Sequence, residues 1–109
     1  MIELIIYNYL KSKDFPIYME IPSNPPTKMV VIEKTGSSRE NYINHAVVAI
    51  QSYDESLYKT ATLNEEIKTA MDDIIAETEI SKCQINSDYN AFDTANKRYR
   101  YQAVFDLYY

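Results

Sequence analysis

The sequence predicts an α+β fold in which a mostly antiparallel sheet of about five strands carries two helices, in the order α-β-β-β-α-β-β. Two segments, residues 2–13 and 56–77, place apolar side chains at helical spacing. Five other segments are rich in β-branched and aromatic residues, as strands are. Their short connections favour antiparallel pairing. The 109 residues suffice for one domain, 1–109, with its own core.

The first half of the chain is predicted as one helix and two strands. The apolar stripe of the helix over 2–13 consists of Ile2, Ile5, Ile6, Tyr9 and Leu10. Phe15-Pro16 ends this helix, because proline lacks the backbone donor. Strands are expected over 17–21 and 29–34, and the second has a continuous apolar run that indicates cover on both faces. Residues 36–40 are predicted as a flexible tip in which Gly36 supplies a positive φ.

The second half is predicted as a strand over 42–53, a helix over 56–77 and a C-terminal hairpin. The expected buried side of the helix consists of Leu57, Ala61, Ile67, Ala70, Met71, Ile74 and Ile75. Thr62-Leu63-Asn64-Glu65 fits a capping box, so a helix restart at Thr62 is an alternative. The hairpin has arms over 83–92 and 97–108 and a turn over 93–96. Its last strand alternates, with Tyr99, Tyr101, Ala103, Phe105 and Leu107 on one face.

Composition argues against most cofactor and metal chemistry. The chain has one glycine, one cysteine and one histidine. A glycine-rich phosphate loop, an intramolecular disulfide, a cysteine-rich zinc site and a multi-histidine metal site are therefore excluded. We expect no cofactor and no metal.

No set of residues predicts catalysis. His45 lies in a strand without a serine or cysteine spaced as a nucleophile partner, and Cys83 has only Lys82 beside it to lower its pKa. The pairs Asp72-Asp73 and Glu65-Glu66 diverge around a helix, so neither pair shares one ligand. An enzyme is the least favoured function, because no nucleophile, base and orienting group come together.

The net charge of −5 is concentrated in one segment. Residues 54–79 hold eight acidic residues and two lysines, whereas the rest of the chain is close to neutral. This segment forms a solvated face or an electrostatic docking surface, and it repels nucleic acid. The N-terminal residues lack an export signal and are too short an apolar run to span a membrane, so we expect a cytoplasmic site of synthesis.

The eleven tyrosines favour a protein-binding role. Tyrosine is enriched at protein interfaces, and several tyrosines crowd the last strand beside basic residues. Base stacking is the alternative use of such a strand, and the acidic segment argues against it. The candidate interface residues are Ser37, Ser38, Arg39, Tyr42, Arg98, Arg100 and Tyr108.

Three segments in this order resemble the tail terminator, or tail completion, family of long-tailed bacteriophages. They are residues 15–36 with their "P-x-Y" start and "T-G" end, residues 46–53 leading into the second helix, and residues 98–105. The likeness covers nearly the full length and depends on order and spacing. Ser37 stands where relatives often carry a second glycine.

The resemblance implies a structural virion protein without catalysis. Such proteins form a six-membered ring that caps the finished tail tube, ends polymerisation and presents the head-tail joining surface. The implied partners are further copies of the chain, the tail tube protein and the head completion or connector protein. The implied location is the virion, after assembly in the bacterial cytoplasm. The competing interpretation is a small regulatory or protein-binding module, monomeric or dimeric.

Overall fold

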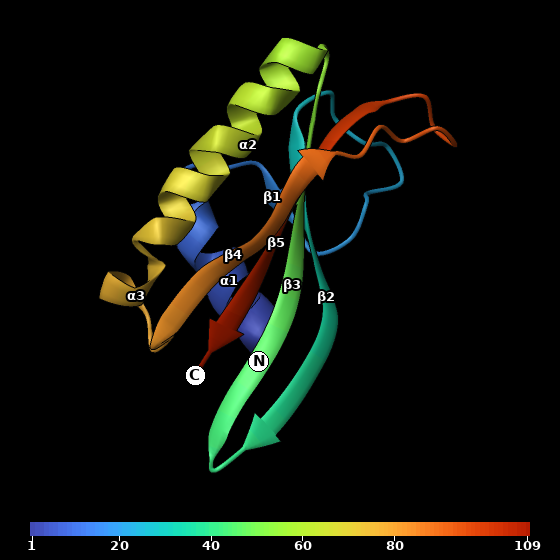
Figure 1. The fold of residues 1–109 in the computed structure, drawn as a ribbon. Helices are drawn as coiled ribbons and strands as arrows, with labels where there is room; N and C mark the ends of the chain where they lie inside the picture. Colours follow the sequence, from blue (N-terminus) through green and yellow to red (C-terminus); the bar gives the residue numbers. More distant parts are fainter.

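The computed structural model describes residues 1–109 and confirms the α+β class (Figure 1). Five strands form one sheet in the order β1-β2-β3-β5-β4; β1 pairs with β2 in parallel, and all other pairs are antiparallel. The elements are α1 (Ile2–Ser12), β1 (Ile17–Tyr18), β2 (Met29–Glu40), β3 (Ile43–Asp54), α2 (Leu57–Asp72), α3 (Ile74–Glu77), β4 (Lys82–Asn90) and β5 (Tyr99–Tyr108).

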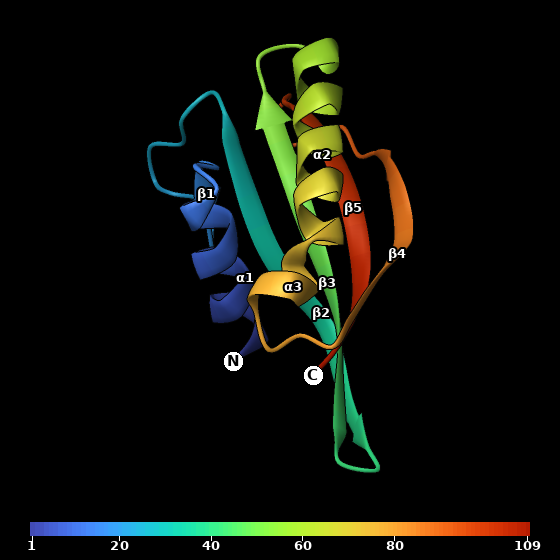
Figure 2. The ribbon, with the colours of Figure 1, turned by 90° about the vertical axis from the view of Figure 1, so that its left-hand side faces the viewer.

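The helices cover one face of the sheet and leave the other open (Figure 2). The main core joins the apolar side of α1 and α2 to alternate residues of β2, β3 and β5. On the opposite face a smaller cluster of Met29, Val31 and Tyr53 is covered by Tyr18. The start of β2 is therefore buried on both faces, as its continuous apolar run predicted. The predicted stripe of α1 also faces the core.

Helix α2 differs from the prediction in its buried side and in its end. Its buried residues are Thr60, Leu63, Asn64, Ile67 and Met71. Leu57 and Ile75 are 45% and 48% exposed, so their predicted burial is wrong. The helix stops at Asp72, and the short α3 follows it. Ile74 of α3 is buried as predicted, at helical spacing from the buried Ile67 and Met71.

The start of α2 is set by Ser56 and not by Thr62. The Ser56 hydroxyl accepts a hydrogen bond from the backbone N–H of Lys59 at 3.1 Å, and the helix runs unbroken past Thr62. The Thr62 hydroxyl instead donates to the Tyr58 carbonyl one turn back. The alternative restart at Thr62 is wrong.

The predicted flexible tip over 36–40 is part of β2. Strands β2 and β3 pair continuously from Met29–Tyr53 to Glu40–Ile43, with a bulge between Lys34 and Gly36. Gly36 has no positive φ. The turn lies at Asn41 and Tyr42, whose φ angles of 50° and 66° are those of a type I′ hairpin turn. The bulge leaves Thr35 without a paired residue in β3, and residues 36–40, predicted as the tip, continue the strand.

Other boundaries move by a few residues. The strand expected over 17–21 has only the two residues of β1, and Met19 and Ile21 are exposed beyond it. The C-terminal hairpin has the predicted order with shorter arms, closed by a bridge between Asp93 and Arg98. The predicted alternation of β5 is present, with Ala103, Phe105 and Leu107 buried on the helix side.

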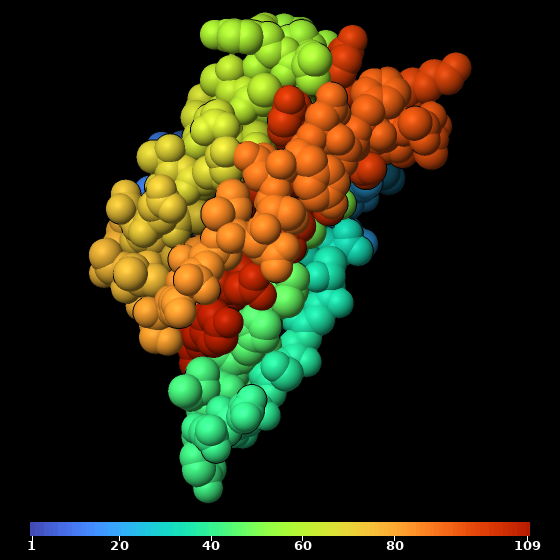
Figure 3. Space-filling view, viewed as in Figure 1, coloured from blue at the N-terminus to red at the C-terminus, as the bar shows by residue number.

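The β2–β3 hairpin makes the molecule elongated, with extents of 43 × 25 × 24 Å. Its end projects beyond the other strands, as the space-filling view shows (Figure 3). The last contacts with the body are the paired backbone hydrogen bonds between Asn44 and Tyr109, both 2.9 Å. Residues 39–43 therefore stand clear of the two-layer body.

Candidate interaction surfaces

The hairpin tip, defined here as residues 37–43, brings together four of the predicted interface residues. Ser37, Ser38, Arg39 and Tyr42 are all exposed, and Tyr42 is 89% exposed. The Arg39 guanidinium lies 5.8 Å from the centre of the Tyr42 ring, a cation–π distance. No hydrogen bond or ion pair engages that guanidinium. The tip therefore presents an exposed cation–π pair that no carboxylate engages.

Arg98 and Arg100 have partners within the chain. Their guanidinium carbons lie 5.1 and 5.9 Å from the ring centre of the buried Tyr53. Arg98 also donates to the Thr27 carbonyl, and Arg100 donates to the Ala91 carbonyl at 2.7 Å. Both side chains are half-buried. Their first role in this structure is to hold two loops against the sheet.

Tyr108 lies on the open sheet face, in a row that reaches the hairpin. Strand pairing aligns Ser38 with His45, His45 with Tyr108, and Tyr108 with Lys82. The His45 and Tyr108 rings stack at 4.7 Å, and the Lys82 ammonium lies 5.5 Å from the Tyr108 ring. This row connects the exposed hairpin to the free edge of β4.

The seven predicted residues thus divide between two ends of the sheet. Arg100 and Tyr108 are eight residues apart on β5, and at about 3.3 Å per residue this separates them by roughly 26 Å. The tip residues and Tyr108 share one end, whereas Arg98 and Arg100 share the other. A single small contact does not include both groups.

Polar side chains form hydrogen-bonded rows across the open face. His45 Nε2 lies 2.8 Å from an Asp106 oxygen, and Asn86 donates to the other oxygen at 3.0 Å. The Asn86 amide, followed by His45, lowers the pKa of Asp106 below its ordinary 3.8. Farther along, Gln51 donates to Gln102 at 2.9 Å. Ser38 lies across the ladder from His45, but no serine or cysteine side chain is hydrogen-bonded to the His45–Asp106 pair.

Cys83 is half-buried at the start of β4 and packs against the main core. Burial raises the pKa of its thiol to about 11. A thiol that stays protonated at neutral pH is a poor nucleophile. No group of three or more His, Cys, Asp or Glu side chains is arranged to hold a metal ion, and no helix is long and apolar enough to cross a membrane.

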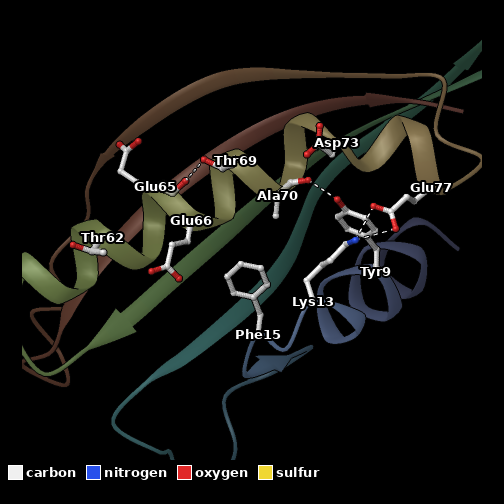
Figure 4. Close-up of a pocket in the computed structure, with 10 residues that line it drawn as sticks. All are labelled: Tyr9, Lys13, Phe15, Thr62, Glu65, Glu66, Thr69, Ala70, Asp73 and Glu77. Atoms are coloured by element: carbon white, nitrogen blue, oxygen red, sulfur yellow. Dashed lines mark hydrogen bonds and ion pairs between the residues drawn. The ribbon is translucent and has the colours of Figure 1, made fainter.

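A groove of about 550 Å³ runs between α1 and α2 on the helix side (Figure 4). Its apolar lining comes from Tyr9, Phe15 and Ala70, and the Tyr9 hydroxyl donates to the Ala70 carbonyl at 2.6 Å. Lys13 bridges the groove to Glu77 at 2.7 Å. The remaining charged lining residues are Glu65, Glu66 and Asp73. We call this feature the acidic groove.

Several acidic side chains of the 54–79 segment are paired, and two in the acidic groove are free. Lys68 pairs with Glu65 at 2.7 Å and with Asp88 of β4, and these partners raise the pKa of Lys68. Asp88 also accepts from the buried Asn64 amide at 2.6 Å. Glu66 and Asp73 are exposed and have no ion-pair partner. Only part of the acidic charge of this segment is therefore left without an ion-pair partner.

Sequence reasoning missed Tyr53 and the acidic groove. Tyr53 lies at the end of a predicted strand, and no pattern in the neighbouring residues predicts that its ring packs under two arginines. The groove combines α1 with α2, which are more than forty residues apart. The signal that pointed toward it was the acidic bias of residues 54–79.

The fold and these surfaces define a two-layer α+β domain with an open sheet face, a projecting hairpin and an acidic groove. Comparison with protein-family models finds no matching family, and comparison with curated proteins finds no matching sequence.

Proposed function

We propose that this chain is a structural virion protein that caps the completed tail tube of a long-tailed bacteriophage. In this role it forms a ring, ends tail polymerisation and presents the surface for head-tail joining. The observation that carries the proposal is the projecting β2–β3 hairpin, whose exposed tip has a polar, cationic and aromatic surface and no partner in its own chain. The order of sequence segments that resembles the tail terminator family supports the same role.

The proposed ring needs a heterologous contact, in which two different surfaces of one subunit meet on successive neighbours. The chain has distinct surfaces of this kind: the cationic hairpin tip, the acidic helix side and the open sheet face. Their separation on one small domain suits head-to-tail addition. Ring closure then depends on the rotation between successive copies.

The proposed partners are further copies of the chain in a hexameric ring, the tail tube protein and the head connector protein. No cofactor, nucleic-acid recognition, membrane contact or catalysis belongs to this proposal. The proposed location is the head-tail junction of the virion, reached after assembly in the bacterial cytoplasm.

The test is negative-stain imaging of particles made with and without this gene. We expect overlong, irregular tails and separate filled heads when the gene is absent, and joined virions when it is supplied in trans. Joined virions with tails of normal length in its absence would contradict the proposal. The remaining function would then be a stand-alone protein-binding module. Its partner would be sought by pull-down, and the open sheet face would be tested as the binding surface.

A further inference from the structure

We infer that the acidic groove between α1 and α2 receives the β2–β3 hairpin tip of a second copy of this chain. The inference rests on the proposed ring and names the contact that joins one subunit to the next. The hairpin tip of one copy enters the acidic groove of the next copy.

The hairpin tip has the features of a segment that enters another molecule. It projects beyond the body, so residues 39–43 are accessible from both sides of the hairpin. Tyr42 and Ile43 are 89% and 53% exposed, an apolar surface that folding of one chain leaves in water. Arg39 adds a guanidinium without a carboxylate partner. The β2–β3 pairing continues to Glu40 and Ile43, so the three side chains lie at the end of a paired hairpin.

The acidic groove has the complementary features. Its lining offers apolar surface from Phe15 and from the ring of Tyr9, and Figure 4 shows the Phe15 ring standing in the space beside α2. Glu66 and Asp73 flank this surface and form no ion pair within the chain, although Asp73 acts on the charge of Lys13 and Glu66 shares a neighbouring pocket with Lys28 and Lys59. The one lysine in the lining, Lys13, is already paired with Glu77. An arriving guanidinium therefore finds carboxylates that are free to accept it.

The two surfaces match in charge, chemistry and size. Arg39 pairs with the free carboxylates, while the Tyr42 ring packs on Phe15 beside it. A groove of about 550 Å³ lies in the range of clefts that hold a small ligand, and it is open enough to take two or three side chains. Because tip and groove are different parts of one chain, the contact is heterologous and repeats from copy to copy.

The first test measures association by light scattering across a concentration series. Arg39→Glu and Glu66→Arg are each expected to weaken self-association by about tenfold or more, because each places like charges at the contact. The double variant is expected to restore association, because it exchanges the two charges. Lys97→Glu is the matched control: Lys97 is exposed in the turn before β5, outside the tip and the acidic groove, and its reversal is expected to leave association unchanged.

The second test traps the contact covalently. A chain with Arg39→Cys and Glu66→Cys is expected to form a ladder of disulfide-linked oligomers under mild oxidation, because each copy links to the next. The native Cys83 does not compete, since burial keeps its thiol protonated. A chain with Lys97→Cys and Glu66→Cys is the control and is expected to give no ladder.

Three results would overturn the inference. They are a wild-type chain that stays monomeric with no ladder from the cysteine pair, single variants that associate like wild type, and a double variant no better than the singles. Loss of joined virions from Glu66→Arg with unchanged self-association would mean that another protein occupies the groove. Imaging separates the two proposals: if deletion gives overlong tails while the Arg39→Glu protein assembles normally, the ring function stands and this contact falls.

Discussion

Tyr53 connects three parts of the chain that are far apart in sequence. Its ring is fully buried under the guanidinium groups of Arg98 and Arg100, and Arg98 reaches on to the carbonyl of Thr27. The loop before β2 and the turn before β5 are thereby fixed to the open side of the sheet. Cation–π contacts of this kind add to the hydrophobic burial of the ring.

We expect Tyr53→Ala to lower the free energy of unfolding by about 3–5 kcal/mol, the cost of removing a large buried aromatic side chain. Urea denaturation measures this change. Tyr58→Ala is the control, because Tyr58 is 81% exposed and its loss is expected to cost less than about 0.5 kcal/mol. Equal effects of the two substitutions would contradict the role of Tyr53.

Asp106 makes part of the folding stability depend on pH. Its pKa is lowered in the folded protein by the Asn86 amide and by His45, so the unfolded chain binds the proton more tightly. The contribution is present above the ordinary value of 3.8 and is lost as pH falls through the lowered folded value.

Asp106→Asn is therefore expected to destabilise the protein by about 1.5 kcal/mol at pH 7, the lower end of the range for a hydrogen bond to a charged group. The difference from wild type is expected to shrink as pH falls through the lowered folded pKa of Asp106. Denaturation curves at several pH values measure it. A difference that is constant with pH would rule out this linkage.

The residue scale was the hardest to predict from sequence. The positions of Arg98 and Arg100 in an alternating strand predicted an outward face, and the structure places them on the open face. Their partners at residues 27, 53 and 91 are distant in sequence, and no local pattern encodes them. The aromatic and basic residues of the last strand predicted an interface. In the structure, Arg98 and Arg100 instead pack against Tyr53 of the same chain.

At the scale of elements, local rules predicted most of the fold. The stripe of α1 and the alternation of β5 follow from spacing that a core imposes directly. The β2–β3 tip was predicted wrongly because Gly36 is the only glycine and sits near the middle of the hairpin. The chain instead turns at Asn41 and Tyr42, which both have a positive φ, and Gly36 lies beside a β-bulge.

The start of α2 gives a direct contrast between two candidate caps. Ser56→Ala is expected to cost about 1 kcal/mol, because the Lys59 N–H loses its side-chain acceptor. Thr62→Ala is expected to be neutral or slightly stabilising, because alanine is the better helix former at an exposed interior position. Thermal denaturation compares the two. A larger loss from Thr62→Ala would restore the capping box at residue 62.

At the scale of the whole molecule, the acidic segment 54–79 predicted a negatively charged surface but did not predict the acidic groove. The groove exists because α1 and α2 lie side by side on the sheet, and this depends on the complete strand order. Lys13, which follows α1, then pairs with Glu77, 64 residues away in the sequence. The number of carboxylates left for a partner therefore depends on such ion pairs as well as on the net charge.

Self-association through the tip and the acidic groove is expected to weaken with salt. Screening shortens the range of charge attraction from about 10 Å at 0.1 M to about 3 Å at 1 M. Sedimentation velocity at rising sodium chloride measures the oligomer fraction. Oligomers that grow with salt would instead indicate a contact dominated by apolar surface.

The turn of the hairpin implies a trade between stability and assembly. Tyr42 has a φ of 66°, a left-handed backbone that costs a residue other than glycine roughly 1 kcal/mol. Tyr42→Gly is therefore expected to make the single chain more stable in denaturation while weakening its self-association. The two measurements should move in opposite directions. Apart from its cation–π contact with Arg39 the Tyr42 ring is exposed, so this substitution separates the backbone cost of the turn from what the ring adds to assembly.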